Sequence, residues 1–197
     1  MPLLRLLRGG RAPIAWLSTL LAVLWGGAEA TIFFIVPDVL LSIVVLRRPR
    51  LAAWLCLATL AGALAGGLLM YLWGRHNLPA AEGLLLALPA IGGDMLAGVR
   101  TQLETTGVMA LFVGPLTGTP YKIYAVFSPH AGVALPLFLV VSIPARLLRF
   151  VAVTLLVHLI NRLLTPLLGQ RQRLGLLLVV WCAFYAWYFH TFSSIPG

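Results

Sequence analysis

Residues 114–129 read GPLTGTPYKIYAVFSP, and this run restricts the folds that the chain can adopt. It places a lysine, Lys122, and three prolines inside an otherwise apolar sequence. Because proline lacks a backbone donor and clashes with the preceding turn, the run cannot form an ordinary transmembrane helix. It is also too apolar for a loop in water. We therefore predict a broken element within a membrane, where non-helical backbone is tolerated only if protein or a water-lined cavity surrounds it.

The composition places the whole chain in a membrane. Of 197 residues, 61% are hydrophobic and 10% are charged, whereas soluble domains have roughly 25% charged residues. The net charge of +9 comes from 14 basic and 5 acidic residues. Most of the bases lie in short clusters between apolar segments, as the positive-inside rule describes, and these clusters lack interleaved aromatic residues. We therefore expect an integral membrane protein that does not bind nucleic acid.

Three segments are apolar and long enough to cross a bilayer. We predict transmembrane helices over 51–73, 132–161 and 174–192. Gly62 and Gly66 in the first of these suit close packing against another helix. The last one is rich in Trp and Tyr, which are typical of the membrane interface.

Basic clusters bracket residues 12–46. The first lies in the N-terminal segment 1–11, and the second consists of Arg47, Arg48 and Arg50. The positive-inside rule places both clusters in the cytoplasm, so the 35 residues between them must enter the membrane and return. Two full crossings need about 40 residues plus a turn. We therefore predict a cytoplasmic N-terminus, then a first helix and a re-entrant hairpin over 12–46. The start of the chain resembles a signal peptide, but we expect it to be retained.

The same reasoning extends to the rest of the chain. Helix 51–73 then leads outward and helix 132–161 leads back, so the residues between them begin and end outside. Residues 79–104 carry charges at intervals and predict an interfacial helical segment, whereas 107–128 predict a second re-entrant hairpin. The predicted fold is a single all-α membrane domain. It is an inverted repeat of two opposed re-entrant helical hairpins, each followed by a transmembrane helix, plus the C-terminal helix 174–192.

Glu29 and Asp38 are the acidic residues of the first hairpin. Carboxylates inside a membrane mark functional sites by default, so we interpret this pair as proton-coupling or gating residues, or as the partners of a cation. Pro37 immediately precedes Asp38 and shapes the hairpin backbone. The alternative is structural: Glu29 lies at the interface, and Asp38 caps a helix that begins after Pro37.

Lys122 follows Gly118, Thr119 and Pro120 in the second hairpin. These three residues break a helix and expose backbone N–H groups. A broken helix end beside an ammonium group forms an anion site that suits a phosphate. The alternative is that Lys122 extends along the apolar surface to reach water.

Arg146 and Arg149 lie three residues apart in the segment 132–161, and therefore on one face of its helix. Pro144 just before them can open a kink. Guanidinium groups inside a membrane need carboxylates or phosphates, so we assign both arginines, with Lys122, to phosphate binding. The alternative is that both arginines pair structurally with the acidic residues of the first hairpin.

The sequence contains no motif typical of an enzyme, a metal site or a cofactor site. Zinc-ligand spacing, a phosphate-binding loop, a Ser/His/Asp set and a nucleophile elbow do not occur, so we expect neither an enzyme nor a metal or cofactor. Cys56 and Cys182 lie in apolar runs and are interpreted as buried small side chains.

The two hairpins together resemble a known family. Glu29 followed by Pro37-Asp38, the run GTPYKIYA and the later SIPARLLRF are similar to the DedA family, also called the SNARE-associated or VTT-domain family, over residues 25–162. The resemblance implies two opposed re-entrant hairpins and a role in moving lipids between leaflets. The family's essential acids map to Glu29 and Asp38. Its second hairpin commonly carries two arginines, and here Lys122 fills one such place.

The leading hypothesis is a flippase-like or scramblase-like lipid transporter, which moves a lipid phosphate such as polyprenyl phosphate or a phospholipid. The resemblance implies the cytoplasmic (inner) membrane of a bacterium and coupling to the proton motive force. The expected partners are anionic membrane lipids, with protons or a monovalent cation, and an oligomer is left open. Two alternatives remain: a proton-coupled ion or drug antiporter, and a non-transporting membrane assembly factor.

Overall fold

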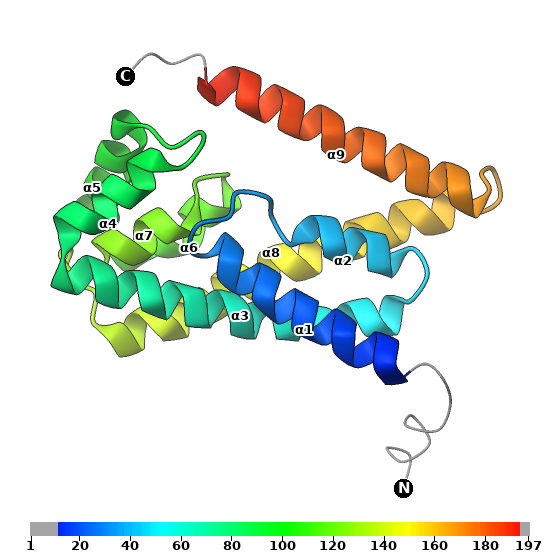
Figure 1. Cartoon of the computed structure of the whole chain (residues 1–197), viewed down its shortest axis with the longest axis horizontal. Helices are drawn as coiled ribbons and strands as arrows, with labels where there is room; N and C mark the ends of the chain where they lie inside the picture. Colours follow the sequence, from blue (N-terminus) through cyan, green and yellow to red (C-terminus); the bar gives the residue numbers. More distant parts are fainter. Residues whose placement is uncertain (1–11, 194–197) are drawn as a thin grey trace, which may run out of the picture.

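A computed structural model describes residues 12–193, and every regular element in that range is helical (Figure 1). The basic segment 1–11, on which the cytoplasmic N-terminus was predicted, lies outside the described residues. The elements in chain order are α1 (Ala12–Glu29), α2 (Asp38–Val45), α3 (Pro49–His76), α4 (Leu78–Ala87), α5 (Gly93–Thr106), α6 (Val108–Val113), the 3₁₀ helix η2 (Gly114–Leu116), α7 (Tyr121–Phe127), α8 (Leu135–Leu164) and α9 (Gln170–Ser193).

Three of the described helices are long and apolar enough to cross a membrane, which confirms the three predicted spans. Helix α3 has 28 residues and α8 has 30, so each is more than 40 Å long at about 1.5 Å per residue. The third span is residues 170–191 of α9. Helix α8 continues without a break through Pro144, so the proline does not end it.

The predicted interfacial segment 79–104 forms two helices, α4 and α5, rather than one. They are separated at residues 88–92, where Pro89 and Gly92 interrupt the helical sequence and Ala90 has a positive φ of 62°. Helix α4 begins with a cap, because the side chain of Asn77 accepts a hydrogen bond from the Ala80 N–H at 3.1 Å.

The two stretches predicted as hairpins are broken by turns. In the first, α1 ends at Glu29 and the short helix α2 begins at Asp38. In the second, α6 and η2 lead into a turn at residues 117–120, after which α7 begins. Helices α2, α6 and α7 have 8, 6 and 7 residues, so none can cross a bilayer, which takes about 20 residues.

Small residues bring α1 and α3 into direct contact. A Cβ atom at Gly62 would overlap the Val23 carbonyl, and one at Gly66 would lie 2.9 Å from the Ala30 side chain. A Cβ at Gly26 would likewise overlap the Thr59 carbonyl. The close packing predicted for Gly62 and Gly66 is therefore present, with α1 as the partner helix.

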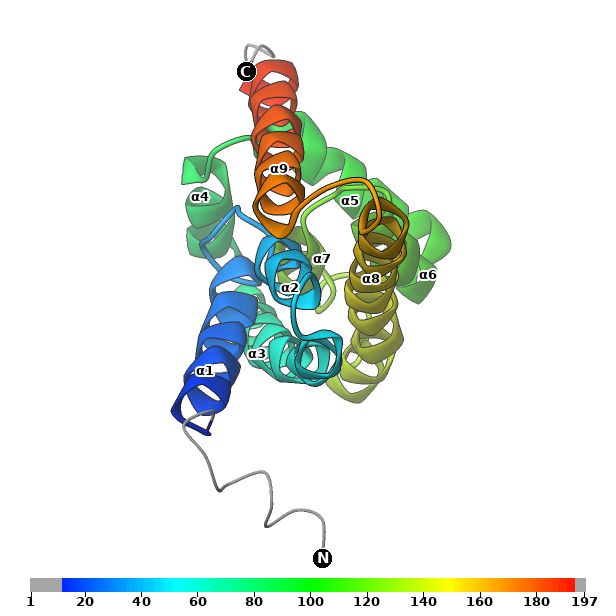
Figure 2. The same ribbon diagram turned by 90° about the vertical axis from the view of Figure 1, so that its right-hand side faces the viewer.

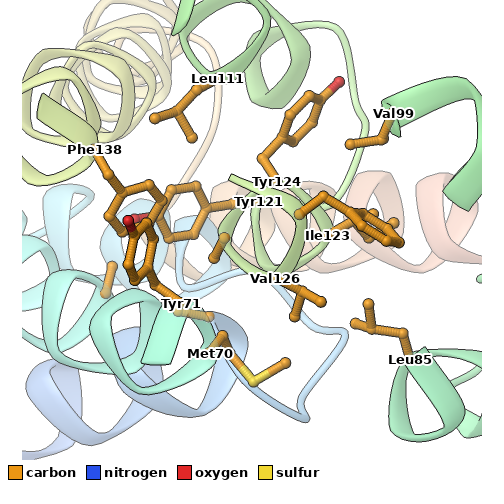
Figure 3. Packing of buried hydrophobic residues seen from close by; sticks show 14 of the residues in the cluster. Met70, Tyr71, Leu85, Val99, Leu111, Tyr121, Ile123, Tyr124, Val126 and Phe138 are labelled. Atoms are coloured by element: carbon orange, nitrogen blue, oxygen red, sulfur yellow. The ribbon is translucent and has the colours of Figure 1, made fainter. Parts of the chain in front are cut away.

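Helix α7 lies in the centre of the molecule, and all seven of its residues are buried. Figure 3 shows its side chains pointing in several directions: Tyr121 lies beside Phe138 and Tyr71, whereas Val126 points toward Met70. The Tyr121 and Phe138 rings are stacked with centroids 5.9 Å apart. The part of the run 114–129 that forms α7 is thus enclosed by protein, as its apolar composition requires.

Helix α9 lies apart from the other long helices. Figures 1 and 2 agree that α2 lies between it and α3. Two side-chain hydrogen bonds connect α9 to the first hairpin: the Tyr185 hydroxyl accepts from the Val36 N–H at 2.8 Å, and Trp181 Nε1 donates to Ser42 Oγ at 3.0 Å. The apolar side chains of α9 are mostly exposed, as lipid contact requires.

Candidate functional site

The five charged residues predicted to form a site lie on four elements whose breaks bring them together. Glu29 is the last residue of α1, Asp38 the first of α2, and Lys122 the second of α7. Arg146 and Arg149 lie one turn apart on α8, which packs against α2 and α3. The breaks therefore deliver the acids and the lysine at helix ends, and the long helix α8 supplies the arginines.

Arg146 is fully buried and forms an ion pair with Glu29. Its guanidinium carbon lies 4.9 Å from the ring centroids of both Tyr121 and Phe150, so aromatic faces enclose the charge. The Tyr121 hydroxyl donates to Ser142 Oγ at 2.8 Å, which fixes the ring. Nε and Nη1 of Arg146 are buried without a hydrogen-bond partner. This arginine is held in place by its surroundings and is closed off from the surface.

Arg149 forms the second ion pair, with Asp38, at 3.1 Å. The Asp38 side chain is 1% exposed and the Arg149 side chain 22%, so this pair is reachable only from the arginine side. Arg149 also lies 3.5 Å from the Pro115 carbonyl of the second hairpin, and Oδ1 of Asp38 has no hydrogen-bond partner. Asp38 makes no capping hydrogen bond at the start of α2, so the interpretation of this residue as a helix cap is wrong.

Lys122 is 3% exposed and does not extend to the surface, contrary to the alternative considered for it. Its ammonium nitrogen donates to the Phe33 carbonyl, in the turn of the first hairpin, at 2.7 Å. Among the described residues it forms no ion pair with a carboxylate. Three cations therefore face two carboxylates, which leaves a formal surplus of one positive charge that belongs to Lys122.

In the turn of the second hairpin, one of the backbone N–H groups that the sequence predicts to be exposed, that of Thr119, is paired within the turn. Gly118 has a φ of +105°, a conformation that glycine adopts without strain, and Pro120 leads into α7. The Thr119 N–H donates back to the Gly114 carbonyl at 3.2 Å, so it is not free to bind an anion. Pro37 lies buried directly before α2, where it positions Asp38.

A cavity of about 330 Å³ lies where the two turns, α9 and the α4–α5 connection meet. Lys122, Arg149 and Glu29 line it, whereas Arg146 and Asp38 do not. Its remaining lining is mainly apolar and aromatic. The aromatic side chains in the lining are Phe33, Phe34, Phe184, Tyr185, Trp187 and Tyr188.

The aromatic residues of α9 that line this cavity were not predicted as part of the site. We assigned the Trp and Tyr residues at this end of the chain to a membrane interface, because aromatic residues near the end of a span are typical of one. The aromatic residues are visible in the sequence as an unusually dense run. Whether their side chains point toward lipid or toward the cavity depends on how α9 packs, which the sequence does not specify.

Arg149 also lines a second cavity of about 300 Å³, together with Asp38 and residues of α9 such as Trp181. Arg149 therefore borders two cavities, one that Lys122 also lines and one that Asp38 also lines. In the described part of the chain, no cluster of three or more His, Cys, Asp or Glu could hold a metal ion. No protein-family model, curated protein or solved structure matches this chain.

Proposed function

We propose that this protein is a DedA-like membrane transporter that moves a lipid phosphate between leaflets. The observation that carries the proposal is the buried surplus charge of Lys122 at the edge of a largely apolar cavity. A buried, uncompensated cation is costly, and an anion that enters beside it removes that cost. A phosphate attached to a lipid supplies both the anion and the apolar part that such a cavity accepts.

Lys122 and Arg149 are the phosphate ligands in this proposal, because both line the cavity. Arg146 has the same charge but lies outside the lining, between two aromatic rings. Its role is to hold Glu29 and thereby the end of α1. The phosphate site, expected from the sequence to contain three residues, therefore contains two in this proposal. A phosphate that binds Arg149 competes with Asp38 for its guanidinium.

The opposed re-entrant hairpins belong to the same proposal. Helices α2, α6 and α7 are too short to cross, and the cavity is lined by Glu29, which ends α1, and by Lys122 near the start of α7. If the hairpins enter from opposite faces, a head group at Lys122 has only part of the bilayer to cross on either side. Release of Asp38 from Arg149 is the step at which a proton can couple to transport.

The test is translocation of a labelled lipid phosphate in liposomes that contain the full chain. Wild-type protein should equilibrate the label between leaflets, and Lys122→Gln should reduce the rate at least tenfold. Arg171→Gln, which removes an exposed charge at the start of α9, should retain the wild-type rate. Equal rates for Lys122→Gln and wild type would defeat the proposal and would favour a proton-coupled antiporter, which tolerates loss of this lysine.

A further inference from the structure

We propose that the cavity beside Lys122 also binds the hydrocarbon segment next to the lipid's phosphate, with the aromatic side chains of α9 as one wall. This inference rests on the proposed function and adds a second part to its site. The charged residues identified from the sequence account for binding of the phosphate alone and give no site for the lipid's chain.

The lining of the cavity has two chemically different parts. Lys122 and Arg149 bring positive charge to it, and Glu29 brings a carboxylate. Phe184 and Trp187 of α9 and Leu88 of the α4–α5 connection supply apolar surface. An occupant that satisfies both parts is an amphiphile with an anionic head and an apolar chain attached to it. A free phosphate would leave the apolar part empty, and a neutral hydrocarbon would leave Lys122 without an anion.

The wall formed by α9 borders both the cavity and the surface of the molecule, which gives a chain a way in. Near the cavity, the contacts of α9 include the hydrogen bond between Tyr185 and the Val36 N–H and the edge contact of the Phe34 and Phe189 rings, whose centroids are 5.2 Å apart. Trp187 is 60% exposed although it lines the cavity, so its ring borders both the inside and the surrounding lipid. A chain can therefore pass from lipid to cavity beside α9.

Affinity alone does not test this inference. Lipid tails are as apolar as the cavity, so transfer of a chain from the bilayer into the cavity gains little hydrophobic free energy. The position of the chain is the informative quantity. Photochemical labelling measures it directly, because a reactive group on the chain marks the side chains that it touches.

The experiment uses the full-length protein in lipid nanodiscs and a dodecyl phosphate whose chain carries a diazirine close to the phosphate. After illumination, peptide mapping by mass spectrometry locates the label. We expect it to concentrate on Phe184 and Trp187 of α9 and on Phe34. Excess unlabelled dodecyl phosphate should reduce this labelling at least fivefold, whereas dodecyltrimethylammonium and inorganic phosphate at the same concentration should not.

Two matched variants test the cavity: one fills it with a large side chain, and the other adds the same side chain outside it. Leu88→Trp places an indole in the cavity, and Leu86→Trp places one on the exposed side of the same chain segment, where Leu86 is 51% exposed and does not line the cavity. We expect Leu88→Trp to reduce the labelling of α9 at least fivefold and Leu86→Trp to leave it unchanged. Thermal unfolding of both variants shows whether they fold.

If Leu88→Trp does not fold, Trp187→Ala against Trp16→Ala provides the same comparison at two similarly exposed tryptophans. In that comparison, only Trp187→Ala should lower the labelling of Phe184 and Phe34. Label spread evenly over the exposed apolar residues of α1 and α8, without competition, would overturn the inference.

Failure of this inference is distinguishable from failure of the proposed function. Translocation that persists without cavity labelling removes the chain site and leaves the transporter. Cavity labelling without translocation removes the transporter and leaves a lipid-phosphate binding site.

Discussion

The two arginines of α8 lie one turn apart but have different surroundings. Arg146 is enclosed by Glu29 and two aromatic rings, whereas Arg149 faces two cavities and is partly exposed. Their spacing of three residues predicted that both lie on one face of the helix, but it could not predict that their surroundings differ. This difference depends on which residues of α1, α2 and α7 lie opposite each turn of α8, and that is a property of the packed molecule.

The first prediction concerns the buried ion pair. Glu29→Gln leaves Arg146 buried without a carboxylate, and breaking a buried pair in this way costs about 3–5 kcal/mol of stability. The same substitution at Glu82 removes a partner from Arg100, whose side chain is 51% exposed, and should cost less than about 1 kcal/mol. Unfolding of both variants in the same detergent measures the difference, and similar losses would contradict the burial of the first pair.

The second prediction separates a binding role of Arg149 from a purely structural one. Asp38→Arg and Arg149→Asp should each destabilise the protein, because each places two like charges together. The double exchange should restore most of the stability but not translocation, because the cation moves away from the cavity and a carboxylate faces Lys122. Full recovery of translocation would instead support the assembly-factor alternative, in which the charges only maintain the fold.

At the scale of the elements, composition and proline placement carried most of the information. The long apolar runs predicted the three spanning helices, and Gly118 and Pro120 predicted the break at residues 117–120. In the first hairpin, Pro37 marked the end of the break at residues 30–37, but the start of that break was not predicted. The division of 79–104 into α4 and α5 was not predicted, although Pro89 and Gly92 mark it. The sequence indicated that Arg146 and Arg149 could pair with Glu29 and Asp38, but it could not show which arginine pairs with which acid. That pairing depends on how α8 packs against the hairpins.

The third prediction tests the contact between α1 and α3. Gly62→Ala places a methyl group against the Val23 carbonyl, so the helices must separate and the melting temperature should fall by several degrees. Gly98→Ala, in α5, meets no atom within 4 Å and should be neutral or stabilising by up to about 1 kcal/mol. A melting temperature for Gly62→Ala at or above that of wild type would contradict the close approach of the two helices.

At the scale of the whole molecule, a compact group formed by α1 to α8 contrasts with the loosely attached α9. The group is centred on α7, whose residues are all buried. The polar contacts of α9 include those of Tyr185 and Trp181 with the first hairpin and those of Arg173 with Asn161 and Thr165. The sequence predicted α9 as a membrane span, and its length and composition agree. The sequence could not predict that α9 lines a cavity, because this depends on which face of the helix packs toward the hairpins.

The fourth prediction concerns this attachment. Tyr185→Phe removes the hydrogen bond to the Val36 N–H and keeps the ring, so amide exchange in α9 and at Val36 should accelerate severalfold while exchange in α3 stays unchanged. Phe184→Leu, one residue away and without a polar contact, serves as the control. Unchanged exchange in Tyr185→Phe would show that α9 is held by its apolar contacts alone.

The surplus positive charge of Lys122 also has an electrical consequence. In the proposed transporter, Lys122 stays in place and neutralises a singly charged phosphate only while it is bound, so each translocated head group carries one negative charge across the membrane. One elementary charge corresponds to about 2.3 kcal/mol per 100 mV if it crosses the whole field. A voltage imposed across the liposome would then act on translocation, and its sign would determine which leaflet becomes enriched in cargo.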